Sequence, residues 1–205
     1  MYTREQIETA VKEKGYKWFE DANDKGYDVN IVGVRNNATK GRVTNAFDDH
    51  ITISYKMDGE WYFECFKCTT DPGTHWVENI MREEGVAILK PGQYRSSHKL
   101  RLHAGKYMAL GQQKPVKVYR DNNKDGKYDL IEESVQEGLF GINIHRATGR
   151  SGGTSTRVDK WSAGCQVIAN NDNWHEFLDI CHAAREVWGN NFTYTLIESN
   201  DIDQA

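Results

Sequence analysis

A β-rich α+β fold, with one helix near each end of the chain, is what the sequence predicts. Its 205 residues are enough for one domain with a normal hydrophobic core. Segments rich in β-branched and aromatic residues recur along most of the chain, whereas apolar residues at helical spacing lie near its two ends. Strands and helices segregated in this way are typical of α+β domains. We therefore expect a single domain spanning residues 1–205.

The N-terminal element is predicted to be a helix over residues 3–24, within a helical extension of residues 1–28. Thr3 and Gln6 have the spacing of a capping box, and apolar residues recur after them at helical intervals. Strands are predicted next at residues 29–35, 50–56 and 60–68. The last two are joined by Asp58-Gly59, a dipeptide that favours a tight hairpin turn.

The rest of the chain carries further strands around one long loop. A short helix is predicted near residues 75–83, and strands are predicted at residues 85–94, 106–112, 114–120, 138–145 and 164–169. Residues 147–160 are rich in Gly, Ser and Thr and predict a flexible loop, which in this position often borders a binding site. A helix capped by Asn173 with Glu176 then carries an apolar stripe that includes Cys181, and a strand at 191–199 completes the fold.

Composition and charge exclude several classes of protein. The formal net charge is -4, which leaves no overall basic surface for nucleic acid and no polybasic patch for a membrane. No apolar run is long enough to span a bilayer, and the charged N-terminal residues lack the apolar block of a secretion signal. We therefore expect a chain made in the cytoplasm without a signal peptide, with no nucleic-acid or membrane partner.

The cysteines do not form a disulfide or metal pattern. Four in 205 residues are too few for a disulfide scaffold. Cys65 and Cys68 lie in a strand-like run, where positions three apart face opposite sides of a sheet. We interpret them as buried thiols rather than as a zinc or redox site.

Residues 121–132, "DNNKDGKYDLIE", have the pattern of an EF-hand-like calcium loop. Hard cations such as Ca²⁺ take six to eight oxygen ligands, and Gly126 allows the sharp turn that this wrapping requires. The predicted oxygen donors are Asp121, Asn123, Asp125, Lys127 through its carbonyl, Asp129 and Glu132. The alternative is an acidic turn between two strands. Because a strand-like segment precedes the loop, we expect structural Ca²⁺ rather than a regulatory sensor.

A second pattern, "WSAGCQVI" at residues 161–168 with "GINIH" at residues 141–145, raises the possibility of catalysis. A nucleophilic cysteine needs a base within hydrogen-bond reach and backbone N–H groups for the oxyanion. Gly164 would let a substrate carbonyl approach, and the N–H groups of Gly164 and Cys165 would face the developing charge. His145 would take the thiol proton if its strand lies beside that of Cys165. The alternative is that both side chains only pack in the core.

The spacing of these residues resembles the signature of the L,D-transpeptidase catalytic domain (YkuD-like) family. His145, sixteen intervening residues and then Ser162-Ala163-Gly164-Cys165 match the family pattern of His, a variable stretch, Ser/Thr-His-Gly-Cys and an Asn or Arg two positions on. The resemblance is strongest over residues 138–170. The chain is a divergent variant, because Ala163 replaces the family histidine and Val167 stands where the family has Asn or Arg.

The resemblance implies a fold, a reaction and a set of roles. The fold would be the family's sandwich-like one, with Cys165 as the nucleophile and His145 as the general base. The carbonyl of Arg146 would orient His145, and the hydroxyl of Ser162 would shape the turn. The implied substrate is the stem peptide of bacterial peptidoglycan, attacked at a diamino-acid–D-alanine bond. The acyl-enzyme would then pass to an amine or to water.

Other residues are candidates for substrate binding. Arg146, Arg150 and Arg157 flank the loop between the two motifs, and arginine binds carboxylates such as those of stem peptides through a bidentate fork. The alternative is solvated surface charge. Tyr107 lies in a polar stretch with His98 and His103 that could line the same pocket, although packing or surface roles suit the two histidines better.

Two functions follow from these patterns. The first is a cysteine peptidase or acyltransferase on peptidoglycan, of the phage-endolysin type that is made inside the cell and reaches the wall after release. The second is a calcium-stabilised, non-catalytic binding or structural domain of a virion or surface assembly. The sequence does not decide between hydrolysis and transpeptidation, and it does not indicate the oligomeric state.

Overall fold

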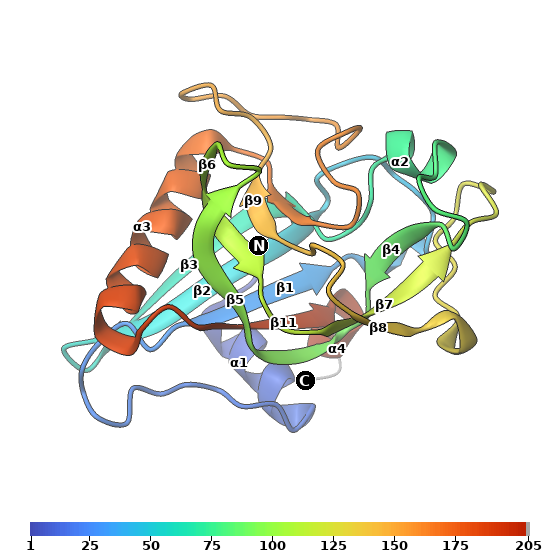
Figure 1. The fold of residues 1–205 in the computed structure, drawn as a ribbon. Coiled ribbons are helices and arrows are strands. Elements are labelled where there is room, and N and C mark those ends of the chain that lie inside the picture. Colours follow the sequence, from blue (N-terminus) through green and yellow to red (C-terminus); the bar gives the residue numbers. More distant parts are fainter. Residues whose placement is uncertain (204–205) are drawn as a thin grey trace.

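The computed structural model describes residues 1–203 and contains a closed barrel of eight strands (Figure 1). Around the barrel the order is β1-β11-β5-β6-β9-β10-β3-β2. The bounds are β1 Asn30–Arg35, β2 Asp49–Met57, β3 Glu60–Thr69, β5 Gly92–His103, β6 Tyr107–Gln112, β9 Ile144–Arg146, β10 Gln166–Ile168 and β11 Phe192–Glu198. The pairs β1–β11 and β9–β10 are parallel, and the other neighbouring pairs are antiparallel.

A second sheet and four helices surround the barrel in the described part of the chain. The sheet has the order β4-β7-β8, with bounds Val86–Leu89, Val116–Asp121 and Gln136–Gly138. The helices are α1 Arg4–Glu13, α2 Thr74–Glu78, α3 Asn171–Trp188 and α4 Ser199–Asp203, and there are 3-10 turns at Asn37–Thr39 and Glu132–Ser134. In Figure 1, α3 lies along one side of the barrel and the second sheet lies on the opposite side. The prediction of a β-rich α+β fold with a helix near each end is confirmed.

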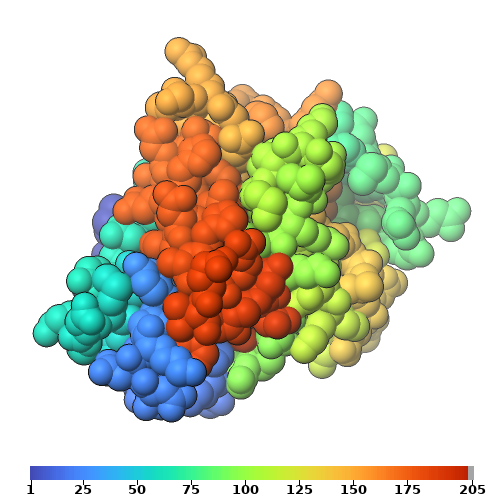
Figure 2. Space-filling model, turned by 60° about the vertical axis from the view of Figure 1, so that its left-hand side comes forward, coloured from blue at the N-terminus to red at the C-terminus, as the bar shows by residue number. Residues whose placement is uncertain are grey.

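The barrel interior and the inner face of α3 share one hydrophobic core. Alternate strand residues such as Ile51, Leu110 and Ile144 point inward and are fully buried. Trp174 and Phe177 of α3 pack into the same cluster. Figure 2 shows α3, in orange to red, covering this face beside the green β5–β6 hairpin. No helix within residues 1–203 has the length and apolar character needed to cross a membrane.

Helix α1 begins as predicted but ends earlier. Both hydrogen bonds of the Thr3–Gln6 capping box are present. The predicted extension to residue 24 is wrong, because the helix ends at Glu13 and Gly15 takes a φ of +71°, which favours glycine and stops helical hydrogen bonding. The helix packs its apolar side on the outer face of β1 and β11, against Val32 and Ile197.

Helix α3 has a different cap from the predicted one. Asn170, not Asn173, is the N-cap, and its side chain accepts hydrogen bonds from the N–H groups of Asp172 and Asn173. Asn173 therefore lies in the first turn. Cys181 is fully buried on the apolar stripe, as predicted. Of the two cysteines in β3, Cys68 is fully buried and Cys65 is half-buried.

Two predicted strands are interrupted. The segment 85–94 divides into β4 and β5 at Lys90-Pro91, and proline cannot donate to a sheet ladder. The segment 138–145 divides into β8 and β9, because Gly141 has a φ of +73° and the side chain of Gln112 accepts the N–H groups of Phe140 and Ile142 in place of a neighbouring strand. This interruption bends the chain directly ahead of His145.

Candidate functional site

The parallel pairing of β9 with β10 brings the two candidate catalytic residues to one face of the barrel wall. Val167 is the register partner of His145, and Gln166 is the partner of Ile144. Ile144 and Gln166 point inward, where the Gln166 side chain accepts a hydrogen bond from the buried Tyr194 hydroxyl. Because side chains alternate along a strand, His145 and Cys165 both lie on the outer face, with Cys165 level with Asn143 and thus two residue positions from His145 along the pair.

The imidazole of His145 is held by backbone and by Tyr107. Its Nδ1 lies 2.8 Å from the carbonyl oxygen of Arg146 and 3.3 Å from the Tyr107 hydroxyl. A carbonyl oxygen only accepts, so Nδ1 carries the proton and Nε2 is the proton acceptor of the neutral ring. The ring of His103 stacks on that of His145, with centroids 4.4 Å apart. The ring is therefore fixed in both tautomer and plane.

The thiol of Cys165 is partly exposed and lies at the start of β10. It donates to the carbonyl of Gly141 at 3.2 Å, and the backbone N–H of Asn143, the residue before β9, contacts the sulfur. Burial raises the pKa of the Cys165 thiol to about 11. Burial also lowers the pKa of His145 to about 4, with a further contribution from His103. At neutral pH the Cys165 thiol and the His145 imidazole are therefore both uncharged, and they do not form a thiolate–imidazolium ion pair.

These protonation states make a prediction for chemical labelling. Because only the thiolate reacts and the thiol pKa is raised to about 11, alkylation of Cys165 by iodoacetamide should become about tenfold faster for each pH unit between pH 7 and pH 10. Peptide mapping by mass spectrometry follows Cys165 separately from Cys65. A rate that already levels off near pH 7 would show an ion pair with His145 and would contradict the neutral pair.

The turn before Cys165 is stabilised by Ser162. The Ser162 hydroxyl accepts the N–H of Gly164 at 3.1 Å and donates to the carbonyl of Cys165 at 2.7 Å. The N–H of Gly164 is thus bound within the turn, which differs from the expectation that it faces a substrate. Gly164 has a φ of +131°, and a Cβ there would lie 2.3 Å from the carbonyl oxygen of Ala87 in β4. Its absent side chain lets β4 pack directly behind the turn.

The other candidate residues are distributed unequally around this pair. Arg146 places its guanidinium 4.3 Å from the ring centroid of Tyr107 and donates to Asn171 of α3 at 3.3 Å. Arg150 is exposed in the loop. Arg157 is also exposed and pairs with Asp159 at 3.6 Å. This pairing does not place its side chain at Cys165 or His145. Tyr107 and Arg146 therefore adjoin the pair, whereas Arg150 and Arg157 belong to the surface of the loop.

The loop over this face is attached at several points. Ala147 and Val158 pack with Phe47 and Val167 in a small apolar cluster against which Cys165 lies. Val167 is fully buried there, so the position where the resembled family has Asn or Arg is used for packing. The N–H of Val158 also donates to the carbonyl of Asn45 at 3.0 Å. The loop thus covers the face beside the thiol.

Sequence reasoning missed Asn143, which contacts two residues of this face. The side chain of Asn143 contacts His103 at 3.3 Å, and its backbone contacts Cys165. Asn143 lies two positions before His145, on the same strand face, which is a signal that alternation alone could have revealed. His98 is fully buried and bonded to the carbonyl of Ile142 at 2.8 Å, so it belongs to the core and not to this site.

The loop 121–132 leaves β7 and is folded as a chain of side-chain-to-backbone turns. The first oxygens of Asp121, Asn123 and Asp125 accept the N–H groups two residues on, at 3.3, 3.1 and 2.9 Å. The Asn123 amide donates to Asp129 at 2.8 Å. Gly126 has a φ of +82°, which allows the turn at the sixth position. The side chains at the first, third and fifth positions of the loop are therefore turned towards its own backbone.

Two details of the loop bear on metal binding. The second oxygen of Asp121 is buried without a hydrogen-bond partner, and the residue as a whole is only 2% exposed. Burial raises the pKa of Asp121, the hydrogen bond from the N–H of Asn123 opposes this, and the charges of Asp129 and Asp125 raise the pKa further. Glu132 instead points to Lys90 and pairs with it. Within residues 1–203 no three His, Cys, Asp or Glu side chains converge as they would around a metal ion.

Comparison with protein-family models, curated proteins and solved structures finds no match to this chain.

Proposed function

We propose that this chain is a cysteine enzyme that acts on the stem peptides of bacterial peptidoglycan, in the manner of the L,D-transpeptidase (YkuD-like) family, with the barrel as a divergent form of that family's sandwich-like fold. The observation that carries the proposal is the position of His145 and Cys165 on one face of the barrel wall, next to Tyr107. The N–H on Nδ1 leaves Nε2 as a base, which is the tautomer that a cysteine–histidine mechanism requires.

In the proposed reaction the sulfur of Cys165 attacks the carbonyl carbon of the scissile amide. His145 Nε2 takes the thiol proton as the C–S bond forms, and the resulting imidazolium gives that proton to the departing amine as the C–N bond breaks. The acyl-enzyme is then released by water, or by an amine in a transpeptidation, with His145 again accepting the proton. Because the ground state is neutral, proton transfer accompanies attack instead of preceding it.

We propose hydrolysis as the main outcome and an endolysin-type role, in which the enzyme reaches the wall after release from a lysed cell. Ala163 and Val167 replace polar residues of the resembled family, so fewer polar side chains are present to bind a second, amine substrate. Water as the acceptor does not require such a binding site.

The test is mass spectrometry of purified peptidoglycan fragments after incubation with the chain. We expect stem peptides to lose their terminal residue, with the masses of the two products together exceeding that of the substrate by one water. The matched blank is the same protein after complete alkylation of Cys165. Unchanged fragments with the active protein, together with measurable binding of those fragments, would favour the non-catalytic binding domain.

We also propose that the loop 121–132 binds structural Ca²⁺. The buried, unpartnered oxygen of Asp121 supports this, because a carboxylate oxygen left without a partner is costly unless a ligand satisfies it. Asp121, Asn123, Asp125, Asp129 and the Lys127 carbonyl would supply oxygens. Glu132 would complete the set after leaving Lys90. The ion would then connect β7 to the 3-10 turn that begins at Glu132.

Calcium should raise the thermal stability of the chain. At a Ca²⁺ concentration about 100 times the Kd, binding only to the folded state adds about 2.7 kcal/mol, which for a chain of this size is a rise in Tm of about 5–10 °C. Differential scanning fluorimetry with Ca²⁺ and with excess chelator measures it. Glu132→Gln should remove most of the shift, whereas the neighbouring Glu133→Gln should retain it. Identical melting curves with Ca²⁺ and with chelator would refute the ion site.

A further inference from the structure

A pocket of about 250 Å³ lies beside the turn that carries Cys165. Its lining includes Ala87 of β4, Arg120 of β7 and Phe140, and it reaches Ala163, two residues before the thiol. Gly141, which accepts the thiol hydrogen bond, directly follows Phe140. The pocket lining therefore includes near neighbours in sequence of the sulfur and of its hydrogen-bond acceptor, because Ala163 is two residues before Cys165 and Phe140 is next to Gly141. It is smaller than the roughly 300–1,000 Å³ of drug-sized ligand sites, so it suits one residue-sized group.

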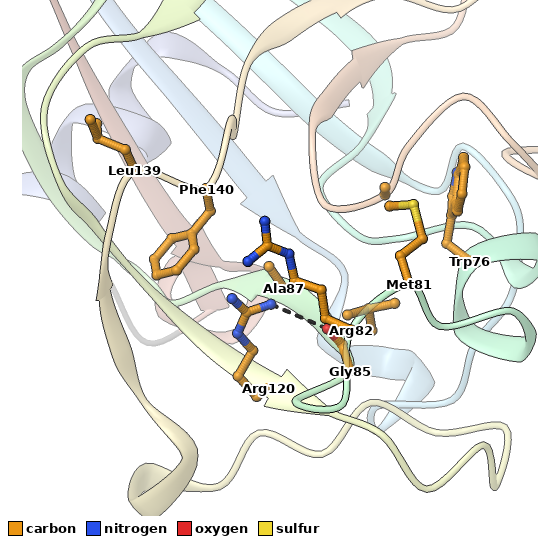
Figure 3. Close-up of a pocket in the computed structure, with 10 residues that line it drawn as sticks. Trp76, Met81, Arg82, Gly85, Ala87, Arg120, Leu139 and Phe140 are labelled. Atoms are coloured by element: carbon orange, nitrogen blue, oxygen red, sulfur yellow. Dashed lines mark hydrogen bonds between the residues drawn. The ribbon is translucent and has the colours of Figure 1, made fainter.

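Two arginine side chains enter this pocket. Figure 3 shows the guanidinium groups of Arg82 and Arg120 near each other, with Phe140 on one side and Met81 and Trp76 on the other. Neither arginine forms an ion pair with a carboxylate within residues 1–203. The pocket therefore combines apolar walls with positive charge that has no direct counterion.

Arg120 is held in a fixed orientation. Its Nη1 donates to the carbonyl of Gly85 at 3.2 Å, its Nε donates to Gln136 at 2.9 Å, and its guanidinium lies 4.9 Å from the ring centroid of Phe140. Its Nη2 has no hydrogen-bond partner in the described part of the chain. An arginine held by its Nε and one Nη, with the other Nη free, is ready to bind a ligand without losing further side-chain freedom.

The electrostatics of the pocket favour an anion. Burial lowers the pKa of Arg120, Glu84 opposes this, and the neighbouring charge of Arg82 lowers the pKa further. The two cations destabilise each other, and an anion between them would relieve that repulsion. Carboxylates match the planar fork of a guanidinium in charge and geometry.

We propose that this pocket is a carboxylate subsite, in which Arg120 and Arg82 bind a carboxylate of the peptide next to its scissile bond. The assignment rests on the proposed action on stem peptides and names how such a peptide would be oriented over Cys165. Two carboxylates of a stem peptide have this chemistry, namely the C-terminal one and the free carboxylate of the diamino acid. The charge and the size of the pocket suit either.

Calorimetric titration on a Cys165→Ala background tests the subsite without turnover. Three synthetic tetrapeptide stems are compared, one with both carboxylates free, one amidated at the C-terminus and one amidated at the diamino acid. Adding Arg120→Gln or Arg82→Gln should weaken binding of the free peptide about tenfold to hundredfold, as expected for the loss of a charged hydrogen bond. The peptide that lacks the bound carboxylate should be insensitive to both substitutions, which identifies the carboxylate. Arg185→Gln, on the exposed side of α3, is the matched control and should change nothing.

The outcomes separate this inference from the proposed function. Equal affinity of all three peptides for the parent and for both arginine variants would overturn the subsite, as would the absence of any binding by the free peptide. Cleavage by the wild-type chain with no arginine dependence would leave the enzyme intact and refute the subsite. Arginine-dependent binding without cleavage by the wild-type chain would support the subsite and refute the proposed enzymatic activity. Because Arg120 also bonds to Gly85, Arg82→Gln, whose side chain has no such bond, guards against a folding artefact.

Discussion

Cys165→Ala should reduce stem-peptide turnover by about 10³-fold or more, because the variant has no atom that can form the acyl-enzyme. The substitution removes a small, partly exposed thiol, so the Tm should fall by no more than about 4 °C, as for a loss of about 1 kcal/mol. Turnover is followed by release of the terminal residue from a stem peptide. Cys65→Ala, at a half-buried thiol in β3, is the matched control and should retain full activity.

His145→Ala should give a loss of similar size. The thiol pKa is raised to about 11, so without a base only a small fraction of Cys165 is nucleophilic at neutral pH. The effects of the two substitutions should not add, since nucleophile and base act in one step. His175→Ala, on the exposed side of α3, is the control. Full activity in Cys165→Ala would end the enzymatic proposal.

The sequence was informative about the site where local rules apply. The sequence placed His145 and Cys165 in two strand-like segments and made catalysis conditional on the two strands being neighbours. The parallel β9–β10 pair does bring them to one face. The turn role expected for Ser162 and the carbonyl of Arg146 beside His145 are likewise short-range features, and both contacts are present.

Features that depend on tertiary packing could not be read from the sequence. Arg82 and Arg120 lie on segments with no shared motif, and only the pairing of β4 with β7 brings them together. The division of 138–145 depends on the distant side chain of Gln112. The end of α1 at Glu13 was predictable in principle from Gly15, but the apolar residues beyond it pack without being helical.

The strand β4 connects the proposed ion loop, the arginine pocket and the nucleophile turn. At its start, a Cβ on Gly85 would lie 1.8 Å from the carbonyl of Asp121, the first residue of the loop. Two residues further along, the carbonyl of Ala87 faces Gly164. Both contacts are backbone against backbone and have no room for a side chain. The loop and the turn that precedes Cys165 therefore pack closely against the same short segment, residues 85–87.

Gly164→Ala should destabilise the fold by about 3 kcal/mol or more, because the new Cβ meets the backbone of β4 at a φ that L-residues rarely adopt. For a chain of this size, this is a fall in Tm of at least about 6 °C. Any folded variant should also lose turnover, since relief of the clash moves the backbone beside the thiol.

Gly59→Ala is the matched control for that substitution. Gly59 lies in the β2–β3 turn at a φ of +81°, and nothing lies within 4 Å of the position that its Cβ would take. It should therefore cost only the local penalty of about 1–2 kcal/mol for a left-handed alanine and leave turnover unchanged. Urea unfolding of both variants, read alongside stem-peptide cleavage, separates backbone strain from steric contact. Equal stability losses at the two glycines would mean that β4 does not constrain the turn, and that the thiol is positioned by β9 and β10 alone.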